Sequence, residues 1–313
     1  MIDTWGPLLA GLALLIAGGE LLVRGAVQAA GRLGISPLVI GLTLVGFGTS
    51  MPELVTSVQA GLGGFPGIAF GNIVGSNIAN ILLIAGVSAV ICPIVVTRAA
   101  LSRDAAVMLA VAVVFSGLAA LMALSRGGGG AVVEGRVAYL VVVIRHDRAA
   151  GQGADPGPQV AARGALALPL LIAAGGLVLV IAGGSLLVTG AVSLARGMGV
   201  SETVIGLTIV AVGTSMPELV TSVIAALKRQ GDVAFGNVVG SNIYNILGIG
   251  GVTALIAPSE VPEQIVRFDG PVMVGVSAVL LLFAATGLRI GRREGLALLA
   301  GYAAYAWYLW PTA

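Results

Sequence analysis

The chain of 313 residues is far too hydrophobic for a water-soluble protein. Hydrophobic residues make up 58% of it, charged residues only 10%, and the mean hydropathy is +1.05. A soluble protein of this length needs much more charge to cover its surface. The net charge of +2 gives no basis for nucleic-acid binding, and the single cysteine excludes a disulfide within the chain.

Apolar runs of about 20 residues, the length of a membrane-spanning helix, recur along the whole chain. They predict ten helices, near 6–28, 36–60, 67–92, 104–124, 130–145, 165–190, 202–227, 234–257, 270–287 and 292–310. We interpret the first as a retained helix, because no basic segment precedes it and no clean cleavage site follows it. Residues 146–163 are polar and contain several glycines and prolines, which predicts a flexible linker.

The two groups of five helices are copies of each other at an offset of about 165 residues. Residues 48–58 return letter for letter as 213–223, and residues 70–78 return as 235–243 with one substitution. The repeat predicts an all-α polytopic membrane protein of ten transmembrane helices in two five-helix repeats. Because five helices reverse the direction of insertion, the second copy is expected to be inverted, with the substrate site near the midplane. The predicted divisions are a first repeat at 1–145, a cytoplasmic linker at 146–163 and a second repeat at 164–313.

Basic residues predict the orientation of the chain. With the N-terminus outside, twelve arginines and lysines lie in cytoplasmic loops and four on the other face. The positive-inside rule therefore places both termini outside a multi-pass protein of the cell inner (plasma) membrane. The twelve are Arg24, Arg32, Arg98, Arg103, Arg145, Arg148, Arg163, Lys228, Arg229, Arg289, Arg292 and Arg293, and the four are Arg126, Arg136, Arg196 and Arg267.

Each repeat places a carboxylate, Glu53 or Glu218, directly after a proline in a membrane helix. A charge in that environment is costly and usually marks function. Proline removes a backbone hydrogen bond and displaces the carbonyl four residues earlier, here Gly48 and Gly213. Freed carbonyls at membrane depth are tolerated where they line a cavity or meet an ion. Each motif therefore offers backbone oxygens, hydroxyls and a carboxylate within about one turn.

The next helix of each repeat adds a polar stripe. The stripes are Asn72, Ser76 and Asn80 in the first repeat, and Asn237, Ser241 and Asn245 in the second. Residues four apart share one helix face, which also places Thr49 on the face of Glu53 and Thr214 on that of Glu218. Such side chains can instead join helices by hydrogen bonds, the interpretation that we favour for Asn72 and Asn237.

The donors collected in this way are all oxygens, which hard cations such as Ca²⁺ prefer. Two carboxylates can neutralise one Ca²⁺, two Na⁺ or two H⁺. This shared capacity favours an exchanger, in which competing ions cancel the same buried charge in turn.

The paired Gly-Thr-Ser-Met-Pro-Glu and Gly-Asn-x-Val-Gly-Ser-Asn-Ile-x-Asn segments resemble the alpha-repeats of sodium/calcium exchangers, within the cation/calcium exchanger superfamily. The resemblance implies that Glu53 and Glu218 are the central calcium ligands, with the backbone oxygens of Thr49 and Thr214. For sodium it implies the same glutamates with further groups, namely Ser50, Ser215, Ser76, Ser241 and the carbonyls of Gly46 and Ala211. Asn80 and Asn245 complete the predicted site. The resemblance also implies alternating access, with the long first and sixth helices sliding across a compact core. The short linker indicates a prokaryotic-type protein.

One position departs from the family pattern. Asn245, opposite Asn80, stands where some sodium-driven relatives carry aspartate, so only two formal negative charges face the ions. Three Na⁺ bound together would leave an uncompensated positive charge in low dielectric. The sequence predicts an antiporter that exports Ca²⁺ against an inward Na⁺ gradient. An alternative on the same fold couples to H⁺, which requires both glutamates to take up protons, or moves another divalent ion.

Other classes of function fit less well. A membrane hydrolase needs a nucleophile–base pair or a metal, and Ser50 has no histidine or lysine near its motif. A purely structural scaffold gives no reason to kink two helices beside buried carboxylates. We therefore expect a transporter without enzymatic activity or cofactor, acting as a monomer in the lipid bilayer on Ca²⁺ and Na⁺.

Three acidic residues outside the motifs are given structural roles. Asp104 and Asp269 are expected to begin helices, where a carboxylate favours the positive end of the dipole. Glu20 is expected to form an intrahelical ion pair with Arg24. Tyr139 is matched loosely with Tyr302 in the second repeat.

Overall fold

The computed structural model describes residues 2–33, 37–64, 66–121, 126–151, 166–197 and 211–309, and this part of the chain is almost entirely helical. The first half contains α1 Ile2–Leu33, α2 Pro37–Ile40, η1 Gly41–Val45, α3 Gly46–Thr49, α4 Met51–Leu62, α5 Pro66–Ala79, η2 Asn80–Ala85, α6 Gly86–Ile91, β1 Ile94–Val95, η3 Ala100–Ala105, α7 Ala106–Leu121 and α8 Arg126–Gly151. The second half contains α9 Ala167–Gly197, α11 Ala211–Thr214, α12 Met216–Leu227, α13 Gly231–Tyr244, η5 Asn245–Gly250, α14 Gly251–Ile256, η6 Ile265–Asp269, α15 Gly270–Ala285, β2 Arg289–Ile290 and α16 Arg292–Leu309. The η elements are π-helical stretches within longer helices.

Six helical runs of the described residues are long and apolar enough to cross a membrane. They are Leu9–Leu33, Pro66–Ile91, Ala100–Ala119, Arg126–Arg145, Gly231–Ile256 and Ile265–Ala285. In Pro66–Ile91 and Gly231–Ile256, 78% of the apolar window is buried, against 28% in Ala100–Ala119, so these two runs form the centre of the bundle. The all-α polytopic membrane fold is confirmed, whereas the number of ten crossings stays a prediction.

The helices that carry the glutamates are broken where the prolines predict a break. α3 ends at Thr49 and α4 begins at Met51, and Ser50 between them leaves the helical conformation with φ −85° and ψ 11°. In the second half α11 and α12 flank Ser215, with φ −85° and ψ 7°. The two breaks therefore have the same backbone geometry. Residues 202–210 of the predicted seventh helix, and 152–163 of the predicted linker, lie outside the described residues.

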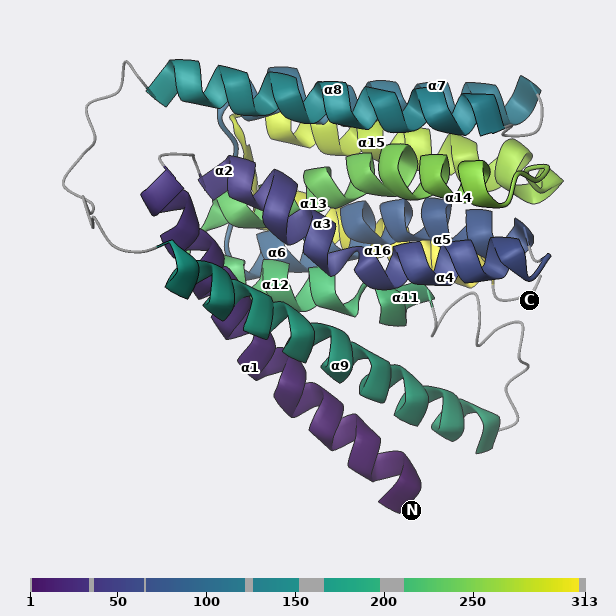
Figure 1. Ribbon diagram of the computed structural model, residues 1–313, viewed down its shortest axis with the longest axis horizontal. Coiled ribbons are helices and arrows are strands. Elements are labelled where there is room, and N and C mark those ends of the chain that lie inside the picture. The colour runs from purple at the N-terminus through teal and green to yellow at the C-terminus, as the bar shows by residue number, and fades with distance from the viewer. Residues whose placement is uncertain are drawn as a thin grey trace.

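α1 and α9 lie side by side and run obliquely to the other helices (Figure 1). Their contact depends on glycine: a Cβ on Gly18 would lie 2.8 Å from the Gly176 carbonyl oxygen, and one on Gly183 would lie 2.8 Å from that of Gly11. These distances are too short for any larger residue, so the two backbones touch directly. The equivalent long helices of the two halves thus pack as one unit.

Two structural expectations are wrong. Asp104 and Asp269 do not begin helices, since each lies within or at the end of a π-helical stretch whose helix continues on both sides. Their carboxylates accept hydrogen bonds from tyrosines instead, at 3.0 Å from Tyr139 Oη and 2.8 Å from Tyr305 Oη. Tyr305, and not Tyr302, is therefore the counterpart of Tyr139.

Two charged positions and the end of one helix also differ from expectation. Glu20 forms an ion pair at 2.6 Å with Lys228 of the other half and none with Arg24. α8 extends to Gly151, so residues 146–151 of the predicted linker continue a helix. Arg136, which the orientation count assigned to the outer face, is buried within α8 with 6% of its surface exposed.

Candidate functional site

Glu53 and Glu218 lie in the interior, at the start of the helices that follow the two breaks. Only 1% and 0% of their surfaces are exposed. Each glutamate follows a proline in the first turn of α4 or α12, which fixes its position directly beside the broken backbone. Neither carboxylate faces lipid.

The two halves exchange hydrogen bonds across this centre. Ser50 Oγ donates to Glu218 Oε1 at 2.6 Å, and Ser215 Oγ donates to Glu53 Oε1 at 3.0 Å. Each glutamate is thus held by the hydroxyl at the break of the other half. Such reciprocal contacts are expected of two equivalent units that meet across a two-fold axis, and they draw the two carboxylates into one site.

Asn72 and Asn237 hold the backbone on which the glutamates sit. Asn72 Nδ2 donates to the Glu53 carbonyl at 3.1 Å, and Asn237 Nδ2 donates to the Glu218 carbonyl at 3.2 Å. Their oxygens accept from the threonines of the opposite break, at 3.2 Å from Thr214 Oγ1 and 3.3 Å from Thr49 Oγ1. These asparagines do join helices, as we favoured, but they do so within the site.

Sequence reasoning did not identify Ser57 and Ser222. Both are fully buried, and they accept from Asn72 Nδ2 at 3.0 Å and from Asn237 Nδ2 at 2.9 Å. A signal was available, because both serines lie in the eleven-residue block that the two halves share letter for letter. They complete a buried hydrogen-bond network around each glutamate.

The serines of the polar stripes are less symmetric. Ser241 Oγ lies 3.4 Å from the Gly46 carbonyl oxygen and 3.5 Å from Glu218 Oε1. Its counterpart Ser76 lies 3.5 Å from Asn72 Oδ1. Ser241 thus contacts Glu218, as Ser50 does, whereas Ser76 contacts an asparagine. Ala211 begins α11, two turns of chain before Glu218, and its backbone lies on the same broken helix.

Asn80 and Asn245 each open a π-helical stretch, a feature that is frequent at functional sites. Asn80 Nδ2 donates to Asn242 Oδ1 of the other half at 3.0 Å. Both side-chain polar atoms of Asn245 are buried, and neither has a hydrogen-bond partner within the described part of the chain. A buried amide of this kind is available to a ligand.

The remaining oxygens suit a hard cation. Oε2 of Glu53, Oε2 of Glu218 and the side-chain oxygens of Asn80 and Asn245 are buried and have no hydrogen-bond partner in the described residues. No group of three His, Cys, Asp or Glu side chains lies together in that same part of the chain. The donors on offer are thus two carboxylates with neutral oxygens, a set that fits Ca²⁺ or Na⁺.

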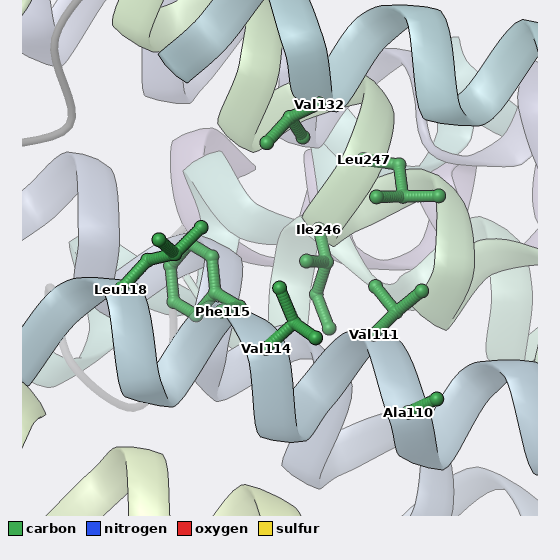
Figure 2. Close-up of a pocket in the computed structure, with 8 residues that line it drawn as sticks. All are labelled: Ala110, Val111, Val114, Phe115, Leu118, Val132, Ile246 and Leu247. Atoms are coloured by element: carbon green, nitrogen blue, oxygen red, sulfur yellow. The ribbon is translucent and has the colours of Figure 1, made fainter.

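A cavity of about 150 Å³ elsewhere in the bundle is chemically different (Figure 2). Its walls come from α7, α8 and η5, and every lining side chain is apolar: Ala110, Val111, Val114, Phe115, Leu118, Val132, Ile246 and Leu247. With no polar atom in its wall, it cannot replace the hydration shell of an ion. This cavity therefore offers no ligand to a cation.

Comparisons with known proteins identify the family of this chain. A family model described as "Sodium/calcium exchanger protein" matches residues 4–144 and 168–310, one match to each half. A protein named CaxA from Alkalimonas amylolytica is 38% identical over 97% of this chain and 98% of its own. The sodium/calcium exchanger MaX1 of Methanosarcina acetivorans is 36% identical over 95% of this chain and 96% of its own.

A solved structure has the same fold. The sodium-calcium exchanger NCX_Mj, soaked with 10 mM Na⁺ and 10 mM Sr²⁺, matches with a TM-score of 0.84 and 33% sequence identity. The match covers 96% of this chain and 97% of that one. The family model matches both halves of the chain, and the relatives and the solved structure match nearly all of its length. The chain belongs to the sodium/calcium exchanger protein family.

Proposed function

We propose that this chain is a secondary antiporter that exchanges Ca²⁺ for Na⁺ across the cell membrane, with both ions bound in turn between Glu53 and Glu218. The observation that carries the proposal is the crossed pair of serine–glutamate hydrogen bonds. Each bond occupies one carboxylate oxygen, and Oε2 of each glutamate has no hydrogen-bond partner among the residues that the structure describes. A site built in this way has two negative charges and two open oxygens for one cation.

The calcium ligands in this proposal are Glu53 and Glu218, with the backbone oxygens of Thr49 and Thr214. Sodium uses the same glutamates together with Ser50, Ser215, Ser76, Ser241, Asn80, Asn245 and the carbonyls of Gly46 and Ala211. Ca²⁺ takes six to eight oxygen ligands in flexible geometry. Because both ions need the same carboxylates, they compete, and competition for one site is the basis of exchange.

The pairing of α1 with α9 supports alternating access. Glycine contacts join these two helices into one unit, and they run obliquely to the rest of the bundle (Figure 1). A unit that moves as a whole past a fixed centre can expose the site to either face. In this proposal both termini lie outside the cell, because basic residues are in excess in the loops of the opposite face. The burial of Arg136 removes one basic residue from the outer face and so increases this excess.

One observation keeps proton coupling as a second candidate. Asn80 and Asn245 are neutral, so the site has only the two glutamates as formal charges. Two Na⁺ or two H⁺ balance those charges equally well. The sodium assignment draws support from the names of MaX1 and NCX_Mj.

Reconstituted vesicles test the assignment. The full chain is placed in liposomes loaded with ⁴⁵Ca²⁺, which then receive an inward Na⁺ gradient, or an inward H⁺ gradient without Na⁺. We expect calcium release with the Na⁺ gradient, and no release from liposomes that contain Glu53→Gln. Release with the pH gradient alone would replace Na⁺ by H⁺ as the coupling ion. Absence of release with either gradient would refute calcium exchange.

A further inference from the structure

Asn80 and Asn242 are in contact across the two halves, and both side chains are buried. Asn80 follows α5 directly and begins η2, whereas Asn242 lies on α13. Asn80 Nδ2 donates to Asn242 Oδ1 at 3.0 Å, and only 0% and 1% of the two residues are exposed. The bond joins a residue of the proposed sodium site to a residue outside that site.

The amide of Asn242 has a single orientation that satisfies its neighbours. Its Nδ2 donates to the Asn77 backbone carbonyl at 3.3 Å and lies 3.6 Å from Met108 Sδ. A carbonyl and a thioether can only accept a hydrogen bond. The nitrogen of Asn242 must therefore point to these two atoms, which leaves its Oδ1 to face Asn80.

The orientation of Asn242 in turn fixes that of Asn80. Because Asn242 presents an acceptor, Asn80 must present its NH2 group, and the Asn80 oxygen points away from this bond. That oxygen is buried and has no hydrogen-bond partner among the described residues. η2, which Asn80 begins, packs against α12, the helix that carries Glu218 in its first turn. The free oxygen thus belongs to a segment that contacts the glutamate helix of the other half.

The equivalent pair in the repeat, Asn77 and Asn245, lacks this bond. The two residues correspond to Asn242 and Asn80 at the offset of 165 positions. Asn77 Nδ2 donates to the Ile73 carbonyl of its own helix at 2.7 Å. Asn77 Oδ1 and both amide atoms of Asn245 have no hydrogen-bond partner in the described part of the chain. Asn77 is therefore a matched control, at which the same substitution removes no contact with a site residue.

We propose that Asn242 is a positioning residue, which holds the amide of Asn80 with its oxygen free for Na⁺. The proposal rests on the function proposed above, in which Asn80 is a ligand of Na⁺ and not of Ca²⁺. A cation is attracted by the amide oxygen and repelled by the NH2 group. Without the acceptor on Asn242, an Asn80 that offers its oxygen leaves a buried NH2 group without this partner, which costs binding free energy.

Transport by the full chain in liposomes tests this role. The Na⁺ concentration for half-maximal Ca²⁺ release is measured, and the half-saturating Ca²⁺ concentration is measured by Ca²⁺–Ca²⁺ exchange without Na⁺. Asn242→Leu, a substitution of similar shape, is expected to raise the half-maximal Na⁺ concentration about tenfold and to change the Ca²⁺ value by less than about twofold. Asn77→Leu is expected to change neither. Asn242→Leu with an unchanged Na⁺ value, or with equal increases for both ions, would overturn the proposal.

A double variant separates positioning from packing. Asn80→Leu removes the oxygen itself, so adding Asn242→Leu to it should not raise the half-maximal Na⁺ concentration further. Additive increases would mean that Asn242 acts by another route than Asn80, and would contradict the proposal.

A structure of the wild-type chain with Na⁺ tests the proposal should Asn242→Leu not fold. We expect Asn80 Oδ1 to contact the ion while Asn80 Nδ2 still donates to Asn242. A bound Na⁺ without contact with the Asn80 oxygen would refute the positioning role and leave exchange intact. Failure of the wild type to release Ca²⁺ with Na⁺ would instead refute the exchanger function, and the positioning role with it.

Discussion

Asp104 and Asp269 occupy the same position in the two halves, but their surroundings differ. Asp104 is paired with Arg103 at 2.7 Å and also accepts from Tyr139. In the second half Phe268 takes the place of Arg103 and stacks on Tyr305, which donates to Asp269. By contrast, Glu53 and Glu218 match in two contacts, the serine of the opposite break on Oε1 and the asparagine amide on the backbone carbonyl.

This contrast indicates which residues must be the same in both halves. In the proposed function, a cation held between the halves needs the same oxygens from both, so each change at the glutamates would remove a ligand. An aspartate away from the site needs only enough donors to satisfy it, and different side chains supply them. Variants made in matched pairs, one in each half, can therefore separate site residues from supporting ones.

The largest effect is expected for Glu53→Gln and Glu218→Gln. Both should lower calcium flux by about a hundredfold or more, since breaking a buried charge pair costs about 3–5 kcal/mol. Flux is measured in liposomes, with Glu20→Gln as the control because its side chain is half exposed and pairs with Lys228, which follows the last residue of α12. Near-normal flux in either site variant would show that the two glutamates do not share one ion.

An intermediate effect is expected for Asn72→Ala and Asn237→Ala. Each removes the donor to a glutamate carbonyl and to a buried serine, at a cost of about 1–3 kcal/mol in stability. We expect flux to fall about tenfold and by the same factor in both. Asn77→Ala is the matched control, because the Asn77 amide donates to the Ile73 carbonyl of its own helix. A large loss of flux for only one of the two variants would show that the two halves do not contribute equally to the site.

The smallest effects are expected away from the ions, and there the halves should differ. Tyr305→Phe removes a hydroxyl donor from Asp269, which is preceded by Phe268 where Asp104 is preceded by Arg103, and is expected to cost about 2 kcal/mol. Tyr139→Phe leaves Asp104 paired with Arg103 and is expected to cost about 1 kcal/mol. Thermal unfolding in detergent measures both, with the half-exposed Tyr308→Phe as reference. The opposite order would mean that Arg103 does not stabilise Asp104.

Some features of the site could be predicted because they are local. The repeat identified both glutamates, the prolines predicted the two breaks, and four-residue spacing placed Ser241 and Asn245 on one face. The role of Asn72 was predicted only in general terms, because its partner is a backbone carbonyl of another helix. Tyr139 was matched with the wrong tyrosine because the offset between the halves shifts by one residue at their ends.

The sequence by itself determined that the chain spans a membrane, that it contains two copies of one unit, and which oxygen-bearing residues gather at each break. Only the tertiary structure decided that each serine bonds the glutamate of the other half, and that Arg136 lies buried instead of in a loop. The physical reason is that composition and periodicity report on a residue and its helical neighbours. Contacts between residues more than 160 positions apart depend on how whole helices pack, for which no short stretch of sequence carries a signal.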